Sequence, residues 1–223
     1  MNRYTLLLLP LVALAQPAYA QDAAEVAISG ADTAWILMST ALVLLMTPAL
    51  AFFYGGLVRS KDMLNTMMMS FVSLGITGVL WALVAYSLAF GAGSPWLGDL
   101  SMAFLAGVGL EAKGSIPHIL FMAFQGTFAI ITVALISGAI IGRMRFSAYM
   151  LFIAAWILLV YAPVCHWVWG GGWIGGMGAL DFAGGAVVHV NAGIAALVAA
   201  SMLGPRKDYG RQALLPHNVP FVL

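Results

Sequence analysis

The sequence predicts an all-α fold, a polytopic bundle of membrane-spanning helices. Of its 223 residues, 63% are hydrophobic and only 8% are charged, whereas a soluble domain averages about 45–50% apolar and 25% charged residues. Five apolar runs are each long enough to cross a bilayer. Because lipid offers the backbone no hydrogen-bond partners, each run must satisfy its own amides and carbonyls as a helix.

The same composition excludes several classes of protein. A surface with so few charges does not suit a soluble enzyme, and a net charge of +1 without a basic run excludes a nucleic-acid-binding protein. A single cysteine excludes a disulfide framework and a cysteine-based zinc site. The sequence contains no Ser-His or zinc-ligand constellation that would indicate a membrane hydrolase. We therefore expect a non-enzyme without a metal or cofactor.

Residues 1–20 resemble a signal peptide. Arg3 gives a short positive region, residues 6–15 form an apolar core, and Ala18-Tyr19-Ala20 fits the cleavage rule. The apolar core is too short to span a bilayer, although an uncleaved first helix is the alternative. Cleavage would leave residues 21–32 as an acidic, extracytoplasmic N-terminus.

The five apolar runs fill residues 33–204, and residues 205–223 follow them. The runs cover residues 33–58, 63–90, 116–142, 146–165 and 183–204. Pro48 and Pro163 interrupt the first and fourth runs and are expected to kink them. In the fifth run small residues recur every four positions, which lets helices approach closely; they are Ala192, Ala196, Ala200 and Gly204.

The basic residues orient the bundle. With the N-terminus outside, only Lys113 falls on the outer side, and seven basic residues fall inside: Arg59, Lys61, Arg143, Arg145, Arg206, Lys207 and Arg211. This is the positive-inside pattern of a multi-pass protein of the inner (plasma) membrane.

Two ionisable residues near the outer end of the fifth run are candidate functional groups. His189 lies inside the apolar run, where a polar group is costly, so it either packs by hydrogen bonding or serves as a pore lining, a proton relay or a haem ligand. Asp181 stands just before the run and can cap its helix or attract a cation.

Aromatic residues gather at the same depth. Phe121, Phe124 and Phe128 share one face of the third run, with Gln125 beside them, and Trp169 lies in a glycine-rich stretch after the fourth. Ring faces near a carboxylate can bind a small cation, at about 0.5–2 kcal/mol per face. No charge lies deeper, so a neutral molecule would cross the rest of the path more cheaply than an ion.

Five segments, in this order along the chain, resemble the ammonium transporter family (Amt/MEP/Rh), and its Amt branch in particular. They are FYGGL at 53–57, AFQGTFA at 123–129, VWGGG at 168–172, ALDFAGG at 179–185 and VVHVNA at 187–192. The segment PHNVP at 216–220 resembles the start of that family's sixth helix. The resemblance covers nearly everything after residue 20.

The resemblance implies roles for individual residues. Phe128 matches the outer ring of a paired gate and, with Phe124, a wall of the outer substrate site. Trp169 matches the residue that closes that site over the cation, and Asp181 the acid needed for recruitment or deprotonation. His189 matches the first of two pore histidines. The implied function is transport of ammonium, or of the analogue methylammonium, with ammonia passing through an apolar pore.

The resemblance also implies a larger protein than this chain. The family has eleven membrane helices, arranged as two inverted five-helix repeats and a final helix, and five are present here. We therefore interpret residues 33–204 as the N-terminal half and residues 205–223 as a cytoplasmic loop and the start of helix six. We expect these 223 residues alone to conduct nothing. A homotrimer in the lipid bilayer and a cytoplasmic PII-type regulator are the implied partners.

Two other functions remain open on sequence. A haem-binding electron carrier would need two facing histidines from His118, His166 and His189, and it would leave the aromatic and acidic residues unexplained. An ammonium sensor would share the transporter fold, and that variant normally carries an additional signalling domain.

Overall fold

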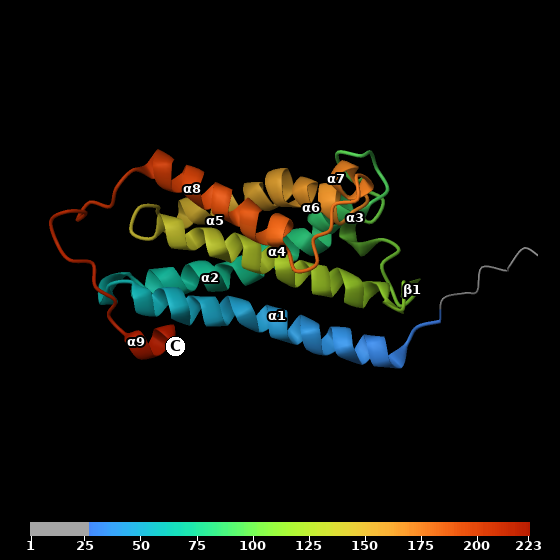
Figure 1. Ribbon diagram of the computed structural model, residues 1–223, viewed down its shortest axis with the longest axis horizontal. Coiled ribbons are helices and arrows are strands. Elements are labelled where there is room, and N and C mark those ends of the chain that lie inside the picture. Colours follow the sequence, from blue (N-terminus) through green and yellow to red (C-terminus); the bar gives the residue numbers. More distant parts are fainter. Residues whose placement is uncertain (1–26) are drawn as a thin grey trace, which may run out of the picture.

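Five long helical spans lie side by side in the computed structural model, which describes residues 27–223 (Figure 1). Each is long and apolar enough to cross a membrane. The predicted bundle of five membrane-spanning helices is thus confirmed. The predicted signal peptide, residues 1–20, lies outside the described residues, as do residues 21–26.

The first and third spans are single α-helices. Span one is α1 (Gly30–Leu57), which begins where the Ser29 hydroxyl accepts a bond from the Asp32 amide (3.2 Å) and remains continuous through Pro48. Span three is α4 (His118–Ile140), whose interior face is the most buried of the five. Since α4 packs against α1, α2 and α8, it forms the centre of the bundle.

The other three spans each contain a π-helical segment. Span two comprises α2 (Ser60–Leu80), η1 (Trp81–Ala85) and α3 (Tyr86–Phe90). Span four comprises α5 (Phe146–Trp156), η3 (Ile157–Tyr161) and α6 (Ala162–Val168), and span five comprises η4 (Gly185–Val190) and α8 (Asn191–Leu203). Pro163 is the second residue after η3, so the missing proline N–H is accommodated next to a wider turn. Such segments often mark functional sites in helices.

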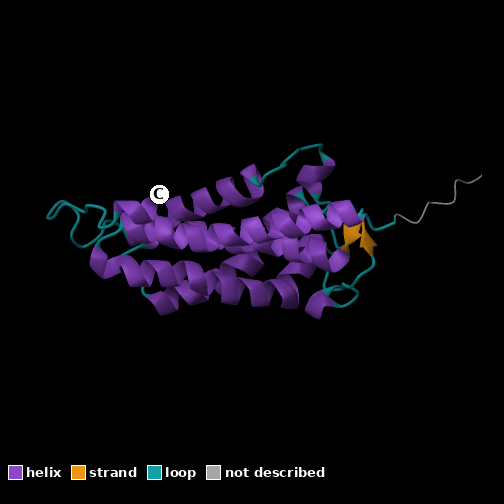
Figure 2. Ribbon diagram, turned by 90° about the horizontal axis from the view of Figure 1, so that it is seen from below, coloured by secondary structure: helices purple, strands orange, loops and turns teal. Residues whose placement is uncertain are grey.

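One end of the bundle, which we call the hairpin end, is formed by residues 91–117 and 169–184. It contains the 3₁₀ turn η2 (Ala103–Leu105), the strands β1 (Ala112–Lys113) and β2 (Ile116–Pro117), and the short helix α7 (Trp173–Gly176). The strands pair antiparallel and are visible at one end of the bundle in Figure 2. The all-α prediction did not include this hairpin, because two-residue strands have no periodic signal.

Glycines allow the backbone to pack closely at the hairpin end. A side chain at Gly170 would clash with the Ala89 carbonyl, and one at Gly172 would lie 2.6 Å from the His166 carbonyl oxygen. Some of the glycines between the fourth and fifth runs, Gly170, Gly172 and Gly175, are therefore explained by contact of backbone with backbone.

The opposite end, which we call the basic end, consists of residues 58–59, 141–145 and 204–218. Arg143 Nη1 donates to the Gly204 carbonyl (2.9 Å), while Arg206 Nε donates to the Ile141 carbonyl (3.0 Å). Arg143, which follows α4, thus binds a carbonyl at the C-terminal end of α8, and Arg206, which follows α8, binds one at the C-terminal end of α4. The chain then returns to α1, against which α9 (Val219–Val222) lies (Figure 1).

Candidate functional site

Three hollows follow one another along α4 from the hairpin end to the basic end. The hairpin-end cavity of about 320 Å³ is lined by α4 residues 121–128. A groove of about 450 Å³, here the His189 groove, is lined by Ile131 and Leu135. The basic-end cavity of about 410 Å³ is lined by Leu135, Gly138, Ala139 and Ile141. Since α4 runs the length of the bundle, the three hollows form a succession across it.

The hairpin-end cavity is walled mainly by aromatic rings. Phe124 and Phe128 meet edge to face with centroids 5.1 Å apart, and Phe128 meets Trp169 in the same way at 5.8 Å. Phe90 and Phe121 form a third such pair at 5.1 Å. The predicted face of Phe121, Phe124 and Phe128 therefore exists and lines a cavity rather than facing lipid.

Asp181 is fixed by the start of span five. Its carboxylate accepts hydrogen bonds from the amides of Gly185 (2.6 Å), Ala186 (3.0 Å) and Val187 (3.0 Å). The predicted capping role is confirmed, since these amides precede the first complete helical turn and lack partners within it. Three amide donors thus fix the position of the carboxylate, which also lines the cavity.

Trp169 is tied to the same loop. Its indole Nε1 donates to the Asp181 carbonyl oxygen at 2.8 Å. This bond orients the ring beside Phe128 and joins the end of span four to the start of span five. The structure thus brings together four of the five predicted site residues, Phe124, Phe128, Trp169 and Asp181, around one cavity.

Gln125 adds an unpartnered polar atom to this cavity. Its Oε1 is buried and has no hydrogen-bond partner within residues 27–223. A buried acceptor without a donor costs free energy. A ligand with N–H groups would satisfy it.

His189, the fifth predicted site residue, lies apart from the aromatic cavity, in the His189 groove. Its Nδ1 lies 3.1 Å from the Gly184 carbonyl oxygen, and Nε2 has no hydrogen-bond partner in the described part of the chain. The ring is exposed along an otherwise apolar surface. Gly193 lies one turn further along span five, and no atom lies within 4 Å of the position that a Cβ atom would occupy there. This face of span five is therefore open, as expected of a cavity lining.

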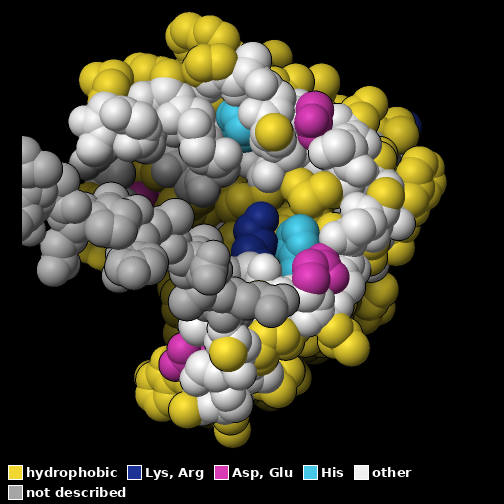
Figure 3. Space-filling view, turned by 90° about the vertical axis from the view of Figure 1, so that its right-hand side faces the viewer, with side chains coloured by type: hydrophobic (Ala, Val, Ile, Leu, Met, Phe, Trp, Pro, Cys, Tyr) yellow, Lys and Arg dark blue, Asp and Glu magenta, His cyan; other side chains and the backbone are white. Residues whose placement is uncertain are grey.

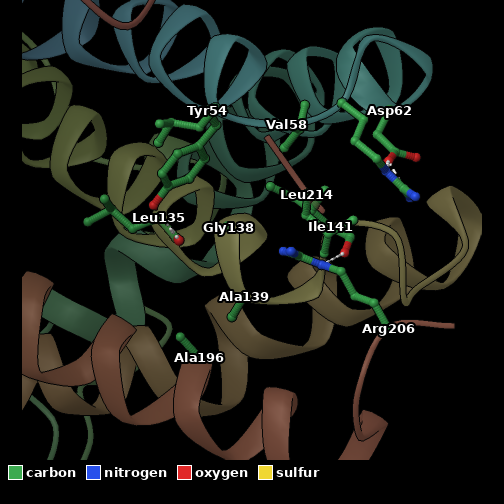
Figure 4. Close-up of a pocket in the computed structure, with 12 residues that line it drawn as sticks. Tyr54, Val58, Asp62, Leu135, Gly138, Ala139, Ile141, Ala196, Arg206 and Leu214 are labelled. Atoms are coloured by element: carbon green, nitrogen blue, oxygen red, sulfur yellow. Dashed lines mark hydrogen bonds and ion pairs between the residues drawn. The ribbon is translucent and has the colours of Figure 1, made fainter. Parts of the chain in front are cut away.

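The basic-end cavity contains charged and aromatic groups (Figure 4). Tyr54 donates to the Leu135 carbonyl (3.1 Å) and lies so close to Gly138 that a side chain there would come within 2.7 Å of its ring. Arg206 lines the cavity, and desolvation and the neighbouring Arg143 lower its pKa.

Neither of the other two candidate haem ligands is free. The ring nitrogens of His166 lie 2.9 Å and 2.7 Å from the carbonyl oxygens of Ala89 and Ser94. His118 contacts Glu111 (2.9 Å) and the Tyr86 hydroxyl (2.6 Å). Since both imidazoles are fully engaged in the protein, the structure does not support the haem-binding alternative. Residues 27–223 also contain no group of three or more histidine, cysteine or acidic side chains that could hold a metal.

Two residues in the wall of the hairpin-end cavity, and one residue that contacts this wall, were not predicted from the sequence. Phe90, the last residue of span two, and Phe182, beside Asp181, both line it. Lys113 lies over the rings of Phe121 and Phe90, with Nζ 5.0 Å and 5.9 Å from their centroids. No local pattern marks these residues, because they come from different segments that meet only in the folded bundle.

The fold is that of a multi-pass membrane protein, and comparison with known proteins specifies the family. Residues 34–223 match the model of the Ammonium Transporter Family. The chain is 54% identical over 191 residues to an ammonium transporter of Bacillus subtilis, covering 84% of this chain and 47% of the relative. The chain belongs to the ammonium transporter family.

Solved structures agree with this assignment. The crystal structure of Candida albicans Mep2 superposes with a TM-score of 0.79 at 37% identity, covering 87% of this chain and 45% of Mep2. A sensor Amt protein superposes with a TM-score of 0.78 at 26% identity, covering 86% of this chain and 50% of the sensor. The chain thus spans about half the length of the relatives it matches. Since both proteins share the fold, the fold does not separate transport from sensing.

Proposed function

We propose that residues 27–223 form one half of an ammonium-transporting pore, with the cation bound in the hairpin-end cavity. One observation carries the proposal: the rings of Phe128 and Trp169 and the carboxylate of Asp181 line a single cavity, beside the unpartnered oxygen of Gln125. Ring faces and a nearby negative charge favour a small cation. An acceptor oxygen favours one that carries N–H groups, such as ammonium.

The path beyond this cavity suits ammonia better than ammonium. Phe124 and Phe128 precede, along α4, the residues that line the His189 groove. Apart from His189, the side chains that line this groove are apolar, including those of Met46 and Val188. A charged ion there would lose its hydration without replacement. We therefore propose that a proton leaves the cation near Asp181 and that the neutral molecule passes Phe128, the outer gate ring. His189 then offers it a polar partner.

The open side of the His189 groove supports the view that the pore is completed by further protein. His189 and Gly193 are exposed on span five, and the groove is bounded by α1, α4 and α9 on its other sides. A groove that is open on one side cannot keep an ammonia path separate from lipid. We propose that these 223 residues conduct nothing alone and that the complete transporter closes the groove.

We also propose an orientation in the membrane and partners for this protein. Seven basic residues on one side place the basic end in the cytoplasm and the hairpin end outside the plasma membrane. We propose a homotrimer with one pore per subunit, and the exposed apolar face of α1, including Trp35 and Leu42, is available for such contacts. A PII-type regulator would dock at the basic end, near Arg59, Lys61, Arg143, Arg145 and Arg206. We propose that residues 1–20 are a cleaved signal peptide.

Uptake by proteoliposomes tests this function. The full-length protein containing this half should take up methylammonium with saturation, and liposomes holding the 223-residue chain should match empty ones. Saturable uptake by the 223 residues would contradict the half-pore. Saturable binding without uptake by the full-length protein would identify a sensor instead.

A further inference from the structure

Lys113 lies against two aromatic rings that also line the hairpin-end cavity. It ends β1, five residues before α4 begins, and its side chain is half-buried. Its ammonium lies over Phe121 at 5.0 Å and over Phe90 at 5.9 Å, both within the range of a cation–π contact. Figure 3 looks onto this end of the molecule and shows basic, histidine and acidic side chains together in its hollowed centre.

The ammonium of Lys113 has no carboxylate within ion-pairing distance among the described residues. Glu111, on the same hairpin, is engaged by the Gly109 amide (2.9 Å) and by His118. Asp32 lies across a separate surface hollow that Lys113 also lines. The charge of Lys113 is thus stabilised by ring faces and forms no ion pair with a carboxylate of the described residues.

The two rings under Lys113 are also walls of the cavity in which we place the substrate. Phe90 and Phe121 line it together with Phe128, Trp169 and Asp181. A primary ammonium and the ammonium ion have the same charge and the same attraction to ring faces. A cation in the cavity is therefore repelled by Lys113 while it is attracted by the rings and the carboxylate.

We propose that Lys113 is a specificity-determining residue, a tethered ammonium that lowers the affinity of the outer cavity for cations. The inference rests on the proposed function, because it assumes that a cation binds in this cavity. Two unit charges about 10 Å apart, at a dielectric between those of protein and water, change a binding constant by roughly three- to tenfold. Because the Debye length is about 10 Å at 0.1 M salt, this effect weakens as ionic strength rises.

Kinetics of the full-length protein test the assignment. Lys113→Met, which keeps length and removes charge, should lower KM for methylammonium about three- to tenfold at low salt and leave kcat within twofold. Lys113→Arg, which keeps the charge above the rings, should stay within about twofold of wild type. The matched control is Lys207→Met, which removes an exposed charge at the basic end and should leave KM unchanged.

Two results would overturn the inference. An unchanged or raised KM in Lys113→Met at both low and high salt would mean that Lys113 does not oppose the cation. The same fall in KM in Lys113→Arg would assign the effect to packing instead of charge.

Equilibrium binding of radiolabelled methylammonium separates this inference from the proposed function. Tighter binding to Lys113→Met, without uptake by any variant, would retain the role of Lys113 and contradict transport. Saturable wild-type uptake with equal binding to wild type and Lys113→Met would retain transport and contradict the role of Lys113.

Discussion

The charges of Arg59 at the basic end and of Asp181 and Lys113 at the hairpin end are held in different ways. At the basic end, Arg59 pairs with Asp62 (2.8 Å) and with Asp208. At the hairpin end, Asp181 is held by backbone amides and Lys113 by ring faces, without a counter-ion in the described residues. Paired charges cancel, whereas charges held by neutral groups keep their field. The hairpin end is therefore suited to act on an ion, and the pairs at the basic end mainly hold loops in place.

Asp181 offers the strongest test of this comparison. Asp181→Ala removes both the charge and three amide bonds, and we expect it to abolish methylammonium uptake. Asp181→Asn keeps one acceptor oxygen, which can retain the two bonds from Ala186 and Val187, so it should still fold, with a slightly lower melting temperature, and lose most uptake. The control is Asp99→Asn, an acid at the same end that accepts bonds from Ser101 and lies outside the cavity. Wild-type uptake by Asp181→Asn would contradict recruitment by charge.

Gly170 tests whether backbone packing builds the hairpin end. Gly170→Ala would place a methyl group against the Ala89 carbonyl. Since both atoms belong to backbone or Cβ and cannot rotate away, we expect a loss on the order of 3 kcal/mol of stability and a lower yield of folded protein. Gly176→Ala is the control, because nothing lies within 4 Å of its added methyl. Equal thermal stability of the two variants in detergent would refute the close approach.

Trp169 tests the aromatic part of the cavity. Trp169→Leu removes the ring face and the bond to the Asp181 carbonyl, and we expect KM for methylammonium to rise about tenfold. Trp169→Phe keeps a ring and loses the bond, so its KM should rise by only about threefold. Trp167→Leu is the control, since Trp167 packs against Trp96 and Trp173 away from the cavity. A KM in Trp169→Leu equal to that of the control would exclude the ring from binding.

The ion pairs of the basic end should have the smallest effect. The hydrogen bond from Arg59 lowers the pKa of Asp208, so this pair stabilises the fold above the usual aspartate pKa and its contribution disappears as pH falls through about 4 and below. Asp208→Asn should lower the melting temperature by on the order of 1 °C at pH 7 and leave KM unchanged, because the pair is partly exposed to solvent and lies far from the hairpin-end cavity. The difference from wild type should vanish in melts recorded at acidic pH. A changed KM would mean that the basic end also acts on the ion.

Most of the bundle was predictable from local sequence. Apolar length set the five spans, with ends within a few residues for α1 and α4, and the spacing of Phe124 and Phe128 predicted their shared face. Span two begins three residues earlier than predicted, because Lys61 and Asp62 fit its first turn, and span four continues beyond Cys165. The three π-helical segments were not predicted, since only Pro163 marks one of them.

Part of the candidate site was predictable for the same reason. Asp181 before an apolar run is a local capping signal, and the structure confirms that cap. Phe90 and Lys113 have no comparable signal. Their place at the cavity depends on how span two and the hairpin pack against α4.

The sequence alone determined the class of protein, the number of spans and the family, because hydrophobicity, helix length and local motifs are properties of contiguous residues. The tertiary structure alone decided that Asp181 binds amides while lining a cavity, that His189 faces an open groove, and that Lys113 lies over two cavity rings. Those facts join residues that are far apart in the sequence, such as Phe90 and Asp181 around the hairpin-end cavity and Met46 and His189 around the groove. Such contacts arise only when the packing of whole helices fixes which surfaces meet.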